Sequence, residues 1–253
     1  MKLLARRYLW LFIAIFSCGT VFAAEPAKLK IAMYDDAGAT SSKEKLIVAV
    51  QKDDRFVVER LKADDIRAGK LQDYRAVLLP GGSSSKQGNT LEEEGREAVR
   101  KFVKNGGGYI GVCAGAYLAT NDYDWSLHIL NAKVIDRKHW ARGIADLELS
   151  LSSPGKDLFG QSADRLTLRY HQGPLLAPAE KEGLPEYREL ARFEAEVAKN
   201  GAPKGVMIGT TAIAAAEFGA GRVLCFSPHP ELTKDQEGLL HRGLEWATSS
   251  AVK

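Results

Sequence analysis

Cysteine is scarce in this chain of 253 residues, which contains only three. Cys18 lies near the N-terminus, so the rest of the chain has Cys113 and Cys225. So few cysteines exclude a small fold held together by a network of disulfides. A single Cys113–Cys225 disulfide would require an oxidising compartment and Cα atoms within about 7 Å of each other.

A large excess of one charge sign is also missing. The chain has 35 Lys+Arg and 32 Asp+Glu, which gives a formal net charge of +3. Lys2, Arg6 and Arg7 account for that whole excess, so the chain without its first 23 residues is neutral. A neutral domain lacks the basic surface that attracts nucleic acid, and we expect no nucleic-acid partner.

Long apolar runs are absent after residue 23, where no stretch approaches the roughly 18 residues of a membrane-spanning helix. The shorter run Tyr8–Phe16 follows a basic start, and Val21 and Ala23 stand at the −3 and −1 positions of a cleavage site. This pattern predicts a secretory signal peptide over residues 1–23, a mature domain over 24–253 and a secreted or periplasmic protein that leaves the membrane after cleavage. An uncleaved anchor and a lipoprotein modified at Cys18 are the alternatives, and the bulky Phe16 argues against the second.

The mature chain alternates apolar strand-like runs with helical segments. Its first half predicts strands at 29–34, 56–59, 74–79 and 109–112, and helices at 41–50 and 91–104. This order is typical of a parallel sheet with helices on both faces. The second half predicts short strands with few helices between them, at 132–137, 146–151, 165–170, 190–194, 206–209, 212–218 and 222–226, and a final helix at 236–248. No repeat or low-complexity linker divides the chain, so we expect one α/β domain.

The segment Gly111–Gly115 (GVCAG) is the strongest local signal for chemistry. It places Cys113 between a predicted strand and a helix, with glycines two residues away on each side. That pattern is typical of a nucleophile elbow, a tight turn that exposes the reactive side chain at the carboxyl end of a sheet. The free N–H groups that begin the next helix, Ala114 first, can lower a thiol pKa and stabilise an oxyanion. The structural alternative is a small buried cysteine.

A second signal follows the predicted strand 222–226, where the chain reads Ser227-Pro228-His229-Pro230-Glu231. The two prolines exclude a helix there and predict extended backbone, in which residues i and i+2 point the same way. Glu231 can then fix the tautomer of the His229 ring and stabilise its protonated form. The alternative is a rigid surface turn with a solvated pair.

Two glycine-containing loops are weaker candidates for binding. Gly81 and Gly82 follow the predicted strand 74–79, and their backbone N–H groups could complete an oxyanion hole. Tyr170, His171 and Gly173 follow another predicted strand and could line the same cleft, although either loop could be an ordinary turn.

Together these segments resemble the class I glutamine amidotransferase-like superfamily, and more closely its biotin-protein ligase N-terminal-like family. The resemblance covers nearly the whole mature chain and rests on five segments, 34–39, 79–82, 107–117, 170–174 and 221–231. It implies a flavodoxin-like α/β fold with a mostly parallel sheet. It also implies a Cys113–His229–Glu231 triad.

The sequence departs from that superfamily at two points. Amidotransferases usually carry a glutamine soon after the nucleophile that helps to hold the glutamine substrate, but Ala116-Tyr117 stands there in this chain. The chain also ends at Lys253, soon after Glu231, without room for a synthetase or ligase domain. Export would remove ATP as well. We therefore expect neither amidotransfer nor biotin ligation.

Three functions remain open from the sequence. The first is a cysteine-dependent hydrolase, glutaminase-like but without a synthetase partner, that acts on a carboxamide or other acyl group of a small molecule or peptide. The second is a non-catalytic module that binds such a ligand, and the third is a redox or stress-response thiol protein of the DJ-1 and PfpI kind. We expect no cofactor and no metal, because His128, His139 and His241 lack metal-ligand spacing. The oligomeric state stays open.

Overall fold

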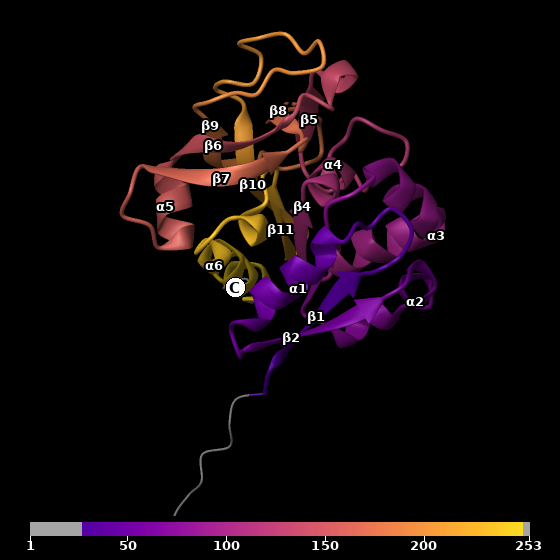
Figure 1. Ribbon diagram of the computed structural model, residues 1–253. Helices are drawn as coiled ribbons and strands as arrows, with labels where there is room; N and C mark the ends of the chain where they lie inside the picture. The colour runs from indigo at the N-terminus through magenta and orange to yellow at the C-terminus, as the bar shows by residue number, and fades with distance from the viewer. Residues whose placement is uncertain (1–26, 250–253) are drawn as a thin grey trace, which may run out of the picture.

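The computed structural model describes residues 27–249, and the predicted signal peptide lies outside them (Figure 1). The strands are β1 (Leu29–Tyr34), β2 (Phe56–Leu61), β3 (Ala76–Leu79), β4 (Gly108–Val112), β5 (Ala132–Ile135), β6 (Ile144–Leu151), β7 (Arg165–His171), β8 (Leu175–Pro178), β9 (Arg188–Phe193), β10 (Thr211–Phe218) and β11 (Gly221–Phe226). The α-helices are α1 (Ser42–Gln51), α2 (Ala63–Arg67), α3 (Ser84–Lys104), α4 (Ala114–Ala119), α5 (Ser153–Phe159) and α6 (Glu237–Thr248). Short 3₁₀ turns are η1 (Lys70–Asp73), η2 (Arg137–His139) and η3 (Pro230–Leu232).

One sheet joins all the strands, and its two halves differ in direction. The main order is β2-β1-β3-β4-β11-β10-β9-β6-β7, with β8 pairing to β10 and β5 to β8. The pairs from β2 to β11 are parallel, whereas every pair beyond β11 is antiparallel. We call these the parallel half and the antiparallel half. Figure 1 shows β6 and β7 at the opposite end of the sheet from β1 and β2.

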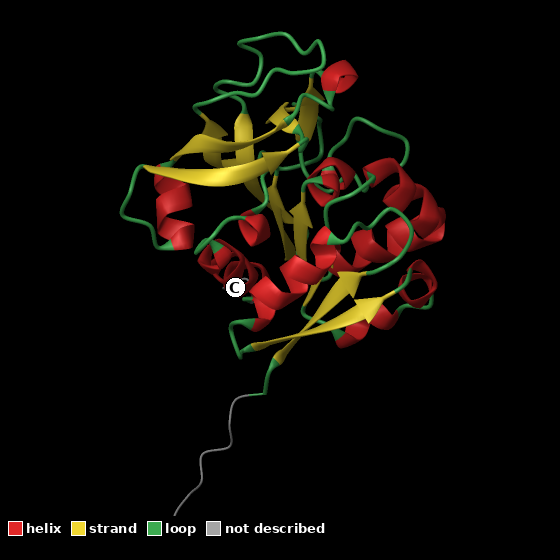
Figure 2. Cartoon of the chain, in the orientation of Figure 1, coloured by secondary structure: helices red, strands yellow, loops and turns green. Residues whose placement is uncertain are grey.

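Helices cover both faces of the parallel half, as predicted (Figure 2). On one face, α1 and α6 pack against side chains such as Ile31, Leu78 and Ile110. On the other face, α2, α3 and α4 pack against the alternate residues of the same strands, such as Val77 and Tyr109. Since successive strand residues face opposite sides, a strand buried on both faces must be apolar throughout, and β4 is fully buried. The predicted α/β class with a parallel central sheet is confirmed.

The structure corrects several expectations for individual elements. The predicted strand Val206–Gly209 is wrong, because these residues form turns. Strand β8 and helices α2 and α5 were not predicted, since each is seven residues or shorter. Helix α3 begins at Ser84, before the predicted start at Leu91, and contains a break at Glu92, where φ is 58°. The predicted helix 91–104 therefore corresponds to the second helical part, residues 93–104.

Among the described residues, none of the helices combines the length and the apolar character needed to cross a bilayer.

Candidate functional site

Cys113 lies in a strained turn between β4 and α4. Its φ of 52° and ψ of −99° are unusual for a residue with a side chain, and such conformations cost roughly 1–3 kcal/mol. The neighbouring glycines permit close packing: a Cβ at Gly111 would lie 2.5 Å from the carbonyl oxygen of Gly115, and one at Gly115 would lie 2.2 Å from that of Leu79. The backbone N–H of Cys113 donates to Phe226 at the end of β11, at 2.8 Å. This bond joins the cysteine turn to the strand that leads to His229.

His229 and Glu231 are in direct contact, as expected, but through a different local structure. Nδ1 of His229 lies 2.7 Å from Oε1 of Glu231, and both side chains are almost completely buried. The backbone is extended at His229, with φ −111° and ψ 90°, but the next residues form the 3₁₀ turn η3 with Pro230 at its first position. The expectation that the prolines exclude a helical turn is therefore wrong, because proline is well tolerated at the first position of a helix.

Gly81 places the loop after β3 against both the cysteine and the histidine. A Cβ added to Gly81 would lie 2.8 Å from Cε1 of His229 and 3.7 Å from Cβ of Cys113. The structure therefore brings the four predicted residues Cys113, His229, Glu231 and Gly81 together at the carboxyl ends of β3, β4 and β11.

The amide groups of this rim are available as donors. Within residues 27–249, the N–H groups of Gly81, Gly82 and Ala114 donate to no protein acceptor. Gly82 has φ 145° and lies beside Ala39 in an isolated bridge, so a Cβ there would lie 2.0 Å from the carbonyl oxygen of Gly38. This contact requires glycine at position 82.

The antiparallel half also reaches the cysteine. Sγ of Cys113 donates to the carbonyl oxygen of His171 at 3.4 Å, and the rings of His171 and His229 have centroids 6.0 Å apart. Tyr170 is fully buried, and its hydroxyl donates to the carbonyl oxygen of Gly173 at 2.9 Å. Gly173 packs on the histidine segment, since a Cβ there would lie 2.0 Å from the carbonyl oxygen of Ser227. Of these predicted lining residues, Tyr170 and Gly173 hold the loop in shape while His171 borders the thiol.

The electrostatics of the site centre on His229. Burial by itself lowers the pKa of this imidazole, but the charge of the Cys113 thiolate and the hydrogen-bonded Glu231 carboxylate outweigh burial and raise the pKa to about 10. Nε2 of His229 has no hydrogen-bond partner among the described residues, because the Cys113 thiol is turned to His171. With a pKa of about 10, the ring is protonated at neutral pH, and Nε2 can return its proton to a leaving group.

Comparisons with known proteins identify the fold. The family model described as biotin-protein ligase, N terminal, matches residues 29–142. The pyridoxal 5'-phosphate synthase subunit PdxT of Desulforudis audaxviator is 25% identical over 188 residues, which cover 70% of this chain and 80% of that protein. PdxT of Deinococcus radiodurans is 27% identical over 184 residues, or 72% and 80% of the two chains. The crystal structure of a glutamine amidotransferase from Thermotoga maritima has a TM-score of 0.59 and 13% identity, and the match covers 89% of this chain and all of that one.

The chain has the class I glutamine amidotransferase-like fold. Within this amidotransferase-like fold, the matched family segment contains Gly81 and Cys113, whereas His229 and Glu231 lie beyond it.

Cys225 and the remaining histidines of this amidotransferase-like chain have no assigned role in the candidate site. Cys113 and Cys225 are both free, and burial raises the pKa of Cys225 on strand β11. The remaining histidines are dispersed, and among the described residues no three His, Cys, Asp or Glu side chains are grouped as a metal site would need.

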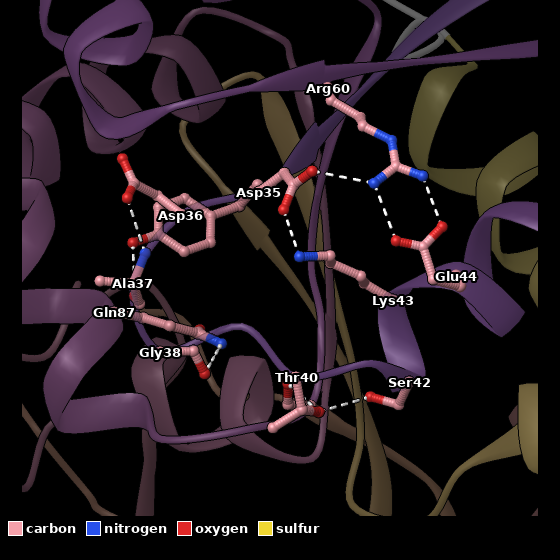
Figure 3. Close-up of polar contacts among 12 residues, drawn as sticks. Asp35, Asp36, Ala37, Gly38, Thr40, Ser42, Lys43, Glu44, Arg60 and Gln87 are labelled. Carbon is pink, nitrogen blue, oxygen red and sulfur yellow. Dashed lines mark hydrogen bonds and ion pairs between the residues drawn. The ribbon is translucent and has the colours of Figure 1, made fainter.

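Sequence reasoning missed three polar residues beside the glycine loop. Ser42 lies within reach of Gly81, with Oγ 3.1 Å from the position of an added Cβ, and Thr40 donates its hydroxyl to the Gly81 carbonyl at 3.1 Å. Gln87 on α3 is fully buried behind the same loop. Figure 3 shows the Thr40–Ser42 contact and the amide of Gln87 beside Gly38. The serine-rich start of α3 and the segment 40–42 are ordinary helix-start sequences, so no pattern distinguished these residues.

Proposed function

We propose that this protein is a cysteine-dependent hydrolase that acts on a carboxamide or another acyl group. The observation that carries the proposal is the meeting of Cys113, the His229–Glu231 pair and the Gly81 loop at one edge of the sheet. Nucleophile, base and orienting carboxylate in this arrangement satisfy the general requirements of acyl transfer through a covalent intermediate.

In the first half of the reaction, Cys113 reacts as the thiolate whose proton Nε2 of His229 already holds, and Sγ forms a bond to the substrate carbonyl carbon. The carbonyl oxygen becomes an oxyanion, which accepts hydrogen bonds from the free amides of the Gly81 loop and Ala114. His229 then gives its proton to the leaving amine, and the carbon–nitrogen bond breaks to leave a thioester.

In the second half, a water molecule attacks the thioester while His229 accepts its proton, and the thiol leaves with that proton as the carboxylic acid is released. Glu231 keeps Nδ1 protonated, so that Nε2 is the atom that gives the proton in the first half and accepts one in the second. Glutamine itself is not proposed as the substrate, because Ala116-Tyr117 stands where amidotransferases usually carry a glutamine.

The test uses p-nitrophenyl acetate as an acylating probe and mass spectrometry to locate the acetyl group. We expect a burst of p-nitrophenolate equal to the enzyme concentration and an acetylated peptide that contains Cys113. The matched control is Cys225→Ala, which removes the buried cysteine and should leave the burst unchanged, whereas Cys113→Ala should abolish it.

Two results would replace this proposal by the alternatives. Ready oxidation of Cys113 to the sulfinic acid, without acylation, would favour a redox thiol protein. Ligand binding that survives Cys113→Ala, without acylation of the wild type, would favour a binding module.

We also propose export by way of residues 1–23. The test is N-terminal sequencing of the protein from the periplasm of a Gram-negative expression host, where we expect a chain that begins at Ala24. An intact N-terminus in the membrane fraction, or a lipid on Cys18, would contradict cleavage at this position.

A further inference from the structure

Gln87 connects the two loops that border the candidate site. It is fully buried near the start of α3, and its Nε2 donates to the carbonyl oxygen of Pro80 at 3.0 Å. The same nitrogen makes a longer contact of 3.5 Å with the carbonyl oxygen of Gly38, which follows β1 (Figure 3). One side chain therefore holds the loop after β3 and the loop after β1 at the same point.

The bond to Pro80 also determines the direction of the next amide. In a trans peptide the C=O of one residue and the N–H of the next lie in one plane and point in opposite directions. Among residues 27–249 there are no cis peptide bonds, so the Pro80 carbonyl that faces Gln87 turns the Gly81 N–H away from α3. Gly81 is the residue that borders His229 and Cys113.

The Gly38 loop leaves little freedom for this arrangement. Gly38 has φ 93°, and a Cβ there would lie 2.6 Å from the backbone nitrogen of Gln87 and 2.9 Å from its Cγ. The carbonyl of Gly38 also accepts a hydrogen bond from the Ser83 N–H at 2.9 Å. The two loops and the first turn of α3 are thus packed together, with Gln87 at the centre.

Stability of the folded state alone would not favour glutamine at position 87. Its Oε1 is buried and has no hydrogen-bond partner among the described residues. An unpartnered buried acceptor destabilises the folded state, and methionine has nearly the same shape without that oxygen. The feature that glutamine adds is the pair of N–H donors that hold the backbone carbonyls.

We infer that Gln87 is a positioning residue, which holds the Pro80 carbonyl so that the Gly81 N–H faces the oxyanion formed when Cys113 attacks a substrate. This inference rests on the proposed function. The glycine loop alone does not fix the direction of the Gly81 N–H, and Gln87 supplies the contact that fixes it. A positioning role for Gln87 predicts different effects on two reactions of Cys113, acylation and alkylation. Acylation passes through an oxyanion, whereas alkylation by iodoacetamide displaces iodide and forms none.

The experiment compares these two reactions in the full chain and in Gln87→Met. Removal of an oxyanion donor slows acyl transfer by about 10²–10³-fold, and a displaced donor should have a smaller effect. We expect p-nitrophenyl acetate to acylate Gln87→Met at least tenfold more slowly than the wild type, on the order of the loss that misplaced donors produce. Iodoacetamide should alkylate both proteins at rates within about twofold of each other, since thiolate formation does not depend on Gly81.

A second variant, Gln87→Glu, provides a pH readout that a purely structural role would not produce. The ionised carboxylate cannot donate to Pro80, but the protonated acid can. The ratio of acylation to alkylation cancels the ionisation of Cys113, because both reactions use the same thiolate. We expect this ratio to rise in Gln87→Glu as the pH falls from 8 to 5 and to stay flat in the wild type.

Asn131→Leu is the matched control, because Asn131 makes the same kind of contact elsewhere. Its Nδ2 donates to the carbonyl oxygens of Leu184 at 2.9 Å and Lys181 at 3.2 Å, beside the β5–β8 pair. The ratio of acylation to alkylation in Asn131→Leu should equal that of the wild type. An unchanged ratio in both Gln87 variants, or an equal loss of both reactions, would overturn the positioning role. A wild type that is alkylated but never acylated at Cys113 would instead overturn the proposed function, and this inference with it.

Discussion

The parallel and antiparallel halves of the sheet contribute differently to the candidate site. The parallel half carries Gly81, Cys113 and His229 at the ends of three adjacent strands, β3, β4 and β11. The antiparallel half adds the end of β7, where the backbone carbonyl of His171 contacts the thiol. The comparison indicates that reactive side chains come from the parallel half, while the antiparallel half closes one side of the site. Substitutions in the parallel half should therefore mainly reduce acylation, and those in the antiparallel half should mainly reduce stability.

The largest effect is expected for His229→Gln in the parallel half. Glutamine cannot act as the general base, and such groups contribute about 10²–10⁴-fold to rates. The burst rate with p-nitrophenyl acetate at pH 7 should fall by roughly this factor. A loss of less than threefold would contradict the assignment of His229 and would weaken the contrast between the halves.

A smaller loss is expected for Gly81→Ala. The new Cβ would lie 2.8 Å from Cε1 of His229, so the buried ring must move and lose alignment with Cys113. We expect the acylation rate to fall by about tenfold or more, because small displacements of reacting groups slow a reaction to this extent. Gly238→Ala on α6 is the control, because an added Cβ there contacts nothing within 4 Å and its burst rate should match the wild type.

In the antiparallel half, Tyr170→Phe should act on stability. It removes the buried hydroxyl that donates to Gly173 and leaves that carbonyl unpaired, which costs about 1–3 kcal/mol. Urea denaturation measures this loss in the free energy of unfolding. Tyr74→Phe, which removes a half-buried hydroxyl bonded to Glu59, should cost less, and equal losses would argue against a special role for the Tyr170–Gly173 hydrogen bond.

The pH dependence of stability should report the His229 environment. Its pKa is raised to about 10 in the folded protein, above the unfolded value of 6.5, so its contribution is fully present below pH 6.5 and is lost as the pH rises through about 10. The difference in Tm between the wild type and His229→Gln should therefore shrink between pH 7 and 10. Parallel Tm curves over this range would show that the folded protein does not hold the imidazolium.

The same contrast between the halves explains how much the sequence could predict. The strands β1, β3 and β4 are short apolar runs, and their alternation with helices is typical of a parallel sheet. The sequence also indicated that Cys113 and His229 would meet, since the carboxyl ends of parallel strands share one edge. In the antiparallel half, β8 was missed and 206–209 was misassigned, because short apolar runs there look alike whether they pair or turn.

The contacts that shape the site were harder to predict than its principal residues. Glu231 reached His229 through a 3₁₀ turn, which the proline rule excluded. Gln87 and the carbonyl of His171 could not be predicted, because their contacts depend on tertiary packing between segments far apart in the chain. Local sequence patterns identify reactive residues better than the groups that orient them.

The bond from the Cys113 amide to Phe226 has a consequence for how such a protein can evolve. Two neighbouring strands of the ladder hold the thiol and the imidazole side by side, and within the hundred or so residues that connect them Arg169 on β7 also accepts a hydrogen bond from the His229 N–H at 2.7 Å. Insertions in the other loops of that stretch can therefore reshape what enters the cleft and leave the sulfur and the ring in register, provided that β7 keeps its place beside His229.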